Sequence, residues 1–143
     1  MTVAGNGIDL KAEQDAIREL LAEYALALDA DDVDGCVQLF TEDGEFVVYG
    51  KTLTGRDKIG RMFTRAPSGL HLIGATHIDV RGSVAAVRSQ VLFVDAATHD
   101  MRPALYDDEL TKTTGRWQFR RRRCQFITGG GLSDTPGQEG QAQ

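Results

Sequence analysis

The sequence predicts an α+β domain in which helices come first and a long antiparallel meander follows. Three observations support this class. Apolar residues recur at helical spacing near the N-terminus, long β-prone runs separated by turn residues fill the second half, and 143 residues is the length of one domain. A strongly curved sheet wrapped around the first helix would enclose a pocket open at one end. The same pattern also allows a flat sheet with the helices packed on one face.

The first helix is expected from about Asp9 to Leu28. Asp9 can cap its start, because a carboxylate there accepts a hydrogen bond from a free backbone N–H of the first turn. The apolar stripe recurs at i, i+3, i+4, i+7, i+8 and i+11. It comprises Ile17, Leu20, Leu21, Tyr24, Ala25 and Leu28.

Shorter elements are expected next. The helical spacing returns at Val33, Cys36, Val37 and Phe40 and predicts a second, shorter helix, which a turn at residues 41–44 ends. Phe46 to Tyr49 is a short β-prone run. A third small helix opens at residues 55–57, and Pro67-Ser68-Gly69 ends it, because proline cannot continue a helix.

Two long hairpins are expected after residue 69. Residues 70–80 and 84–94 flank the turn Arg81-Gly82, and residues 105–111 and 117–127 flank a turn at 113–115. Residues 9–128 are therefore predicted to form the domain, after a flexible N-terminus at residues 1–8. Residues 129–143 are rich in Gly and Gln, have only Leu132 as a sizeable apolar side chain, and predict a disordered or loosely attached tail.

Composition and charge exclude several classes. The net charge of −5 does not favour nucleic acid as a partner, and no apolar run approaches the length of a membrane span. The N-terminus lacks the pattern of a signal peptide, so we expect a cytoplasmic protein. Cys36 and Cys124 lie far apart and are interpreted as small buried side chains in a reducing compartment. No standard nucleotide or metal motif is present, so no cofactor and no metal are expected.

Asp29 and His71 are the candidate acid–base residues. Asp29 follows the apolar stripe at the helix C-terminus, where the helix dipole disfavours a carboxylate and thereby makes it a better proton acceptor. His71 lies in an otherwise apolar strand. An aspartate bonded to one ring nitrogen would fix the tautomer and leave the other nitrogen free to take a proton. The residues alone favour the simpler interpretation, in which Asp29 begins a loop and helps cap the second helix and His71 is structural.

Tyrosines and arginines supply further candidates. Tyr24 and Tyr49 could donate to a substrate oxygen, or could be core and strand aromatics. Strand alternation through residues 120–123 places Arg121 and Arg123 on the face of Trp117 and Phe119, which is typical of a solvated edge strand paired with acids at 107–109. One inward arginine could instead hold an oxyanion or the carboxylate of the acid–base pair.

Four segments resemble the SnoaL-like branch of the nuclear-transport-factor-2-like superfamily. They read EYALALDADDVDGCVQLFTEDGEF, LTGRDKIGRMF, HLIGATHIDVRGSVAAVRSQV and YDDELTKTTGRWQFRRRRC, within roughly residues 12 to 127. The resemblance implies a cystatin-like α+β cone or barrel, with a curved antiparallel or mixed sheet around a long N-terminal helix and an internal apolar pocket. It also implies a homodimer through the sheet. The superfamily hosts enzymes and non-catalytic subunits, so the fold alone does not decide the function.

The resemblance also implies roles for single residues. Asp29 and His71 match the Asp–His pair of scytalone dehydratase and hexachlorocyclohexane dehydrochlorinase, and Tyr49 matches a tyrosine of the dehydratase. Arg122 matches an active-site arginine of the dehydrochlorinase, although alternation places it opposite Trp117 unless a bulge intervenes. Tyr24 matches the oxyanion tyrosine of the ketosteroid isomerases.

Some positions depart from these relatives. Asp95 and Leu28 replace a histidine and a tyrosine of the dehydratase, and Val48 replaces the base of the isomerases. The expected function is cofactor-independent proton abstraction by His71 from a small apolar or cyclic substrate of aromatic, polyketide, terpenoid or steroid-like type. A dehydratase or other lyase is expected first, and an isomerase or polyketide cyclase is the alternative. A ligand-binding module or an accessory subunit is the alternative of another class.

Overall fold

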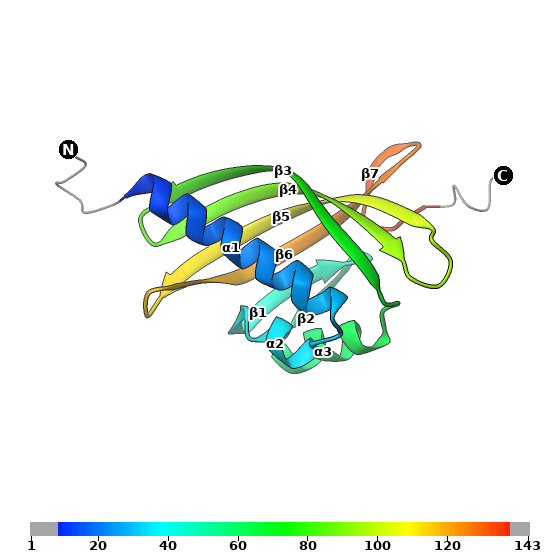
Figure 1. Cartoon of the computed structure of the whole chain (residues 1–143), viewed down its shortest axis with the longest axis horizontal. Helices are drawn as coiled ribbons and strands as arrows, with labels where there is room; N and C mark the ends of the chain where they lie inside the picture. Colours follow the sequence, from blue (N-terminus) through cyan, green and yellow to red (C-terminus); the bar gives the residue numbers. More distant parts are fainter. Residues whose placement is uncertain (1–8, 138–143) are drawn as a thin grey trace.

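The computed structural model describes residues 9–137 and shows a curved seven-stranded sheet with three helices on one side (Figure 1). The expectation of a flexible segment at residues 1–8 lies outside these residues. The helices are α1 (Leu10–Asp29), α2 (Val33–Val37) and α3 (Arg56–Arg65). The strands are β1 (Phe40–Val48), β2 (Lys51–Thr54), β3 (Gly69–Arg81), β4 (Val84–Asp95), β5 (Met101–Thr113), β6 (Arg116–Thr128) and β7 (Gly131–Ser133).

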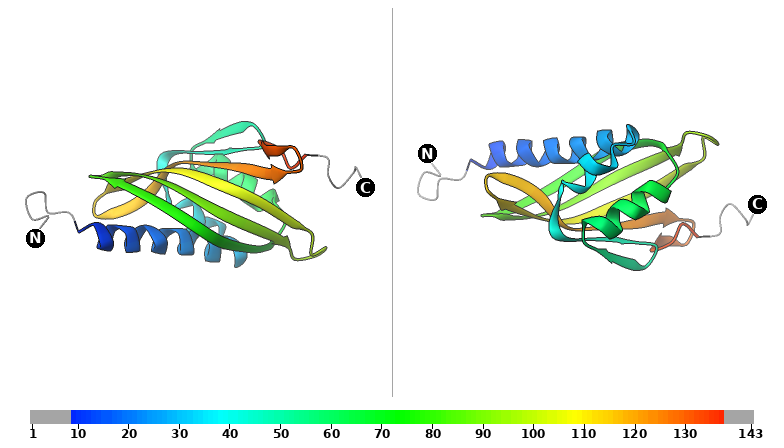
Figure 2. Two further views of the ribbon diagram at one scale, coloured as in Figure 1. Left: turned by 90° about the horizontal axis from the view of Figure 1, so that it is seen from above. Right: turned by 90° about the horizontal axis from the view of Figure 1, so that it is seen from below.

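The sheet is mixed and does not close into a barrel. Its strand order is β2-β1-β6-β5-β4-β3, with β7 added to β6. β1 pairs with β6 in parallel, and the other pairs are antiparallel. Figure 2 shows the long helix α1 lying along the curved sheet, with α2 and α3 at one end of it. The predicted α+β class, with a curved sheet around a long N-terminal helix, is confirmed.

Helix α1 forms as predicted because its cap and its stripe agree. The Asp9 carboxylate accepts a hydrogen bond from the backbone N–H of Ala12 at 3.1 Å. The stripe residues that are buried are Ile17, Leu20, Leu21, Tyr24 and Ala25. They pack against the inner face of the sheet, where they share one core with residues such as Val87 and Phe119. This packing fixes the C-terminal end of α1 beside the start of β3.

The predicted second helix is shorter than expected. α2 ends at Val37, and Phe40 opens strand β1 by pairing with Phe119 of β6. The predicted helix through Phe40 and the turn at residues 41–44 are therefore wrong. The spacing fits a helix locally, but Phe40 is fully buried in the sheet, and the backbone N–H of Phe119 donates to the Leu39 carbonyl at 2.8 Å. Tertiary pairing with β6 overrides the local pattern.

The two long hairpins are confirmed. β3 pairs with β4 and β5 pairs with β6. The ends of β3, β4 and β6 lie within one residue of the predicted ends, and β5 extends four residues before and two residues beyond its predicted range. The third helix is also confirmed, at Arg56–Arg65. The β-prone run at 46–49 forms the end of β1 and the start of a turn. After this turn, β2 pairs antiparallel with β1.

A bulge in β6 reverses the predicted alternation of its arginines. The register with β5 shifts between Glu109 and Leu110, so that Trp117 and Phe119 face inward and so does Arg122. The prediction that Arg121 and Arg123 share the face of Trp117 is wrong. The prediction of an edge strand is also wrong, because β6 lies between β1 and β5.

The described part of the C-terminal segment is ordered, which corrects the expected disorder for residues 131–134. Residues Gly131–Ser133 form β7 and pair with Phe126, Ile127 and Thr128 of β6. The Asp134 carboxylate accepts a hydrogen bond from Arg123 at 3.0 Å. Backbone pairing needs no apolar side chain, which is why composition missed it. Residues 138–143 of the predicted tail lie outside the described residues.

Two further findings concern the surface and the cysteines. Among residues 9–137, no helix is long and apolar enough to cross a membrane. Cys36 and Cys124 are both free and buried, as predicted. Burial raises the pKa of the Cys36 thiol to about 12 and that of the Cys124 thiol to about 11, so both stay protonated near neutral pH.

Candidate active site

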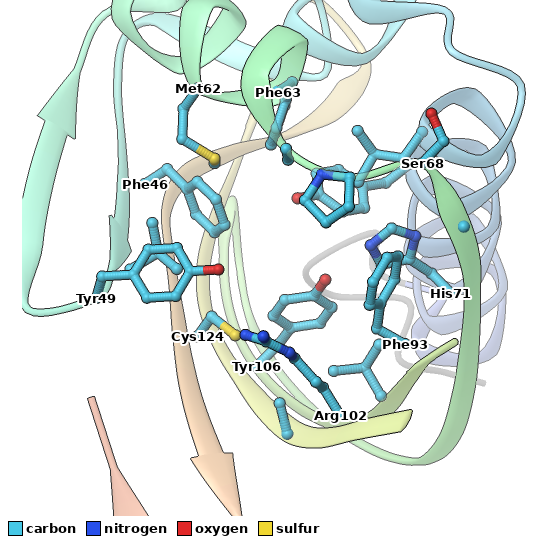
Figure 3. A pocket seen from close by; sticks show the side chains of 18 of the residues that line it. Phe46, Tyr49, Met62, Phe63, Ser68, His71, Phe93, Arg102, Tyr106 and Cys124 are labelled. Atoms are coloured by element: carbon cyan, nitrogen blue, oxygen red, sulfur yellow. The ribbon is translucent and has the colours of Figure 1, made fainter. Parts of the chain in front are cut away.

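A cavity of about 230 Å³ opens between the inner face of the sheet and the helices (Figure 3). Its wall is mostly apolar, with a few polar groups. An apolar cavity of about 150 Å³ holds benzene, so this one accommodates a somewhat larger ring compound. Residues from all three helices and from strands β1 and β3 to β6 line it. They include Tyr24, Leu28, Val48, Tyr49, Met62, Phe63, His71, Phe93, Arg102, Tyr106, Cys124 and Phe126.

Asp29 and His71 meet at the edge of this cavity, as the resemblance implies, although only His71 is among the lining residues. His71 Nδ1 lies 2.8 Å from Asp29 Oδ1. The backbone N–H of His71 also donates to the two carboxylate oxygens, at 3.0 and 3.2 Å. Asp29 is the last residue of α1 and His71 is the third residue of β3, so the packing of the helix on the sheet edge creates the contact. Both side chains are less than one-fifth exposed.

The pair leaves His71 as a neutral base. Burial lowers the pKa of His71 below its ordinary value, and the hydrogen bond and charge of Asp29 oppose this only in part. At neutral pH the ring is therefore uncharged. An ionised Asp29 can only accept a hydrogen bond, so Nδ1 carries the proton and Nε2 keeps a free lone pair. Figure 3 shows the His71 ring in the cavity wall next to Phe93.

Phe93 and Gly69 hold the His71 ring in place. The rings of Phe93 and His71 lie 4.9 Å apart between centroids, and the two residues are direct cross-strand partners in β4 and β3. Gly69 passes so close to β4 that a Cβ added to it would overlap the carbonyl oxygen of Val94 and the ring of Phe93. The missing side chain at residue 69 therefore lets Phe93 pack beside the histidine.

Gly69→Ala should destabilise the fold by about 1–3 kcal/mol, because the methyl group meets backbone that cannot yield cheaply. Chemical denaturation measures this change. The matched control is Gly129→Ala, where a Cβ meets nothing within 4 Å. If both variants unfold at the same denaturant concentration as the parent, the close packing around Phe93 is contradicted.

Three tyrosines surround the cavity. Tyr49 lies at a positive φ of 55° in the turn between β1 and β2, and its ring stacks on Phe126 with centroids 5.5 Å apart. Figure 3 shows its hydroxyl pointing into the cavity from the wall opposite His71. Tyr24 and Tyr106 are buried, and burial raises the pKa of both hydroxyls, so they stay protonated and can donate hydrogen bonds.

The structure does not bring Arg122 into the cavity wall. Its side chain is fully buried and donates to Asp108 at 2.8 and 3.1 Å. Its guanidinium carbon lies 3.6 Å from the centre of the Tyr106 ring and 4.2 Å from that of Tyr24, so it stacks beneath the tyrosines. Arg122 is thus inward, as the bulge requires, but its carboxylate partner is Asp108 and not Asp29. The assignment of Arg122 as an active-site residue is not supported by this geometry.

Sequence reasoning missed Phe93, Arg102 and Tyr106. All three lie on the inner face of β4 or β5, and their alternation with outward residues was present in the sequence, but nothing local indicated which face bounds a cavity. Asp95, which stands where the dehydratase has a histidine, is not among the lining residues and accepts hydrogen bonds from its own turn. Within residues 9–137 no three metal-ligating side chains gather.

The family model for the SnoaL-like domain matches residues 11–123. The chain belongs to the SnoaL-like domain family. This match includes Asp29, Tyr49 and His71 and every cavity-lining residue except Cys124 and Phe126 of β6. No match was found among curated proteins.

Solved structures of similar fold include proteins of three descriptions. A scytalone-dehydratase-like protein of Novosphingobium aromaticivorans is 28% identical, with a TM-score of 0.71, over 80% of this chain and 84% of that one. The type-3 hexachlorocyclohexane dehydrochlorinase of Novosphingobium barchaimii is 17% identical, with a TM-score of 0.70, over 80% and 86%. A cystatin-like protein of unknown function from Nostoc punctiforme is 21% identical, with a TM-score of 0.72, over 79% and 90%. The last two show similarity of fold alone.

Proposed function

We propose that this SnoaL-like protein is a cofactor-independent acid–base enzyme of the lyase type, which dehydrates a small cyclic substrate. The proposal rests on the hydrogen bond between Asp29 and His71 at the edge of a mostly apolar cavity. A neutral imidazole with a free Nε2 and a carboxylate behind it has the arrangement of a general base. The scytalone-dehydratase-like neighbour supports the same reaction class.

The proposed reaction starts from a ring ketone with a hydroxyl group on its β-carbon. His71 Nε2 takes a proton from the carbon between the two groups, and the electron pair forms an enolate. A hydroxyl of Tyr49 or Tyr24 donates a hydrogen bond to the enolate oxygen, and Asp29 stabilises the imidazolium. The bond from the β-carbon to oxygen then breaks, the leaving oxygen takes the proton from His71, and water departs. The atoms and electrons of this dehydration balance without an electron acceptor or a metal.

Isomerisation and aldol cyclisation begin with the same proton transfer, so the products distinguish them from dehydration. A suitable probe is 3-hydroxy-1-tetralone, a bicyclic β-hydroxyketone that yields 1-naphthol when it loses water. The appearance of 1-naphthol is followed by its fluorescence.

We also propose a homodimer through the outer face of the sheet, where Leu70, Leu72 and Met101 are exposed. The cytoplasmic location is likewise a proposal.

Asp29→Asn should lower the rate of 1-naphthol formation by about 10- to 1,000-fold, because the amide keeps the shape and removes the charge that stabilises the imidazolium. The acidic limb of the pH–rate profile should move to lower pH, because loss of the Asp29 charge lowers the pKa of His71 further. A merely structural role would not move this limb. The control is Asp34→Asn, an exposed carboxylate on α2. An unchanged rate and profile in Asp29→Asn would contradict the proposal.

A further inference from the structure

A row of three side chains crosses the wall of the cavity on neighbouring strands. His71 of β3 pairs with Phe93 of β4, and Phe93 pairs with Arg102 of β5. Directly opposed residues point to the same face of a sheet, and all three line the cavity. Each step between opposed residues spans about 5 Å, so the α-carbons of His71 and Arg102 lie about 10 Å apart. Figure 3 shows Phe93 beside His71 and Arg102 along the margin of the cavity.

Arg102 is the only arginine or lysine among the described residues that line the cavity. No carboxylate within residues 9–137 forms an ion pair with it, whereas the arginines of β6 at residues 120–123 each have an acidic partner. The charge of Arg102 contributes to the lowered pKa of Asp95 less than do the hydrogen bonds that this carboxylate accepts from the backbone N–H groups of Ala97 and Thr98. The guanidinium is therefore available to a ligand at the mouth of the cavity.

The charges of the cavity are separated along this row. Asp31 also lines the wall, but it follows α1 and its carboxylate accepts a hydrogen bond from Ser68 at 3.0 Å, beside the start of β3. Among the lining residues, the carboxylate of Asp31 thus lies at the His71 end and the positive charge at the Arg102 end, whereas Asp95, which interacts with Arg102, does not line the cavity. Between them the Phe93 ring offers a flat apolar surface. An anionic ring compound is favoured in one orientation, with its anion at Arg102.

We propose that the substrate is a ring compound that carries a carboxylate, bound by Arg102, with its ring on Phe93 and its reacting carbon at His71. An arginine binds a carboxylate through two parallel N–H donors, which fixes orientation as well as position. A span of two strand spacings fits a one- or two-ring skeleton between the two groups. This inference rests on the proposed function, because it takes the cavity to be the substrate site.

Two probes of the same shape test the inference by binding alone. 2-Naphthoate carries the carboxylate, and 2-naphthamide replaces it with a neutral amide. Calorimetric titration should show that the parent binds 2-naphthoate about tenfold or more tightly than 2-naphthamide. Arg102→Gln should abolish this preference by weakening the binding of 2-naphthoate, and Arg102→Lys should restore part of it. The preference should also shrink as salt is added, because Arg102 is exposed.

Control variants separate this inference from the proposed function. Arg65→Gln removes an exposed arginine of α3 that does not line the cavity, and it should leave the preference intact. His71→Ala should also keep the preference, because it removes the base and not the anion site. Equal affinity of the parent for the two probes, no binding of 2-naphthoate, or an unchanged preference in Arg102→Gln would overturn the inference. None of these results bears on whether His71 abstracts a proton.

Discussion

His71→Ala should lower the rate of 1-naphthol formation from 3-hydroxy-1-tetralone by about 10²–10⁴-fold, the usual contribution of a positioned general base. The methyl group of alanine cannot accept the proton that Nε2 would take. The control is His77→Ala, which removes an exposed histidine of the same strand. A parent-like rate in His71→Ala would mean that another group, or no group, acts as the base.

The fold of His71→Ala should survive. Asp29 keeps the hydrogen bonds from the backbone N–H of residue 71, so its carboxylate is not left without a partner. The loss of the ring removes one face of contact with Phe93. A loss of the cooperative unfolding transition in this variant would show that His71 is mainly structural.

The parent should lose activity in acid. His71 is the base only when neutral, and burial lowers its pKa below the ordinary value of 6.5. The rate should therefore be flat near neutral pH and fall as the pH drops through that lowered pKa. The free energy of unfolding should also decrease as the pH drops, since the unfolded chain binds a proton at His71 more readily than the folded one. A midpoint of this acidic fall in rate above pH 6.5 would contradict a lowered pKa for His71.

Asp108→Ala should destabilise the protein by about 3–5 kcal/mol, because it leaves the Arg122 guanidinium buried without its carboxylate. Both side chains of this pair are fully buried, and Arg122 Nη1 already has no hydrogen-bond partner among the described residues. The aromatic rings of Tyr24 and Tyr106 stabilise the cation but cannot replace a charged partner. Urea denaturation followed by circular dichroism measures the change.

Two comparisons make this prediction specific. Glu109→Ala breaks the exposed ion pair with Arg120 on the same two strands, and it should cost at most about 1 kcal/mol. The double variant Asp108→Leu/Arg122→Met should be much more stable than Asp108→Ala, because it removes both charges from the core together. Equal costs for Asp108→Ala and Glu109→Ala would contradict the importance of burial at this pair.

The elements whose local pattern agrees with their packing could be predicted from the sequence. α1 has both a cap and an apolar stripe, and the two long hairpins have turn residues where turns are needed. Phe40 shows the limit, because its spacing favours a helix while pairing with β6 places it in a strand. β7 shows another limit, since it forms through backbone hydrogen bonds that composition does not reveal.

The site was predictable only in part. The pairing of Asp29 with His71 was expected from the resemblance to known enzymes, while the residues alone left it open, and the structure brings the two side chains together. The place of Arg122 depended on a bulge, which shifts every following side chain to the other face and leaves no clear trace in a single sequence. Arg102 was missed because its place in the cavity wall depends on its cross-strand pairing with Phe93, and a single sequence does not reveal this register.

Exchange of the C2 protons of 1-tetralone with deuterium oxide, followed by NMR, tests most directly whether His71 is a base held by Asp29. This ketone has no leaving group, so the measurement reports proton abstraction alone. The parent should accelerate the exchange over the buffer rate, and His71→Ala should lose most of the acceleration, by about 10²-fold or more. Equal exchange rates in the parent and in His71→Ala would contradict acid–base catalysis by this pair.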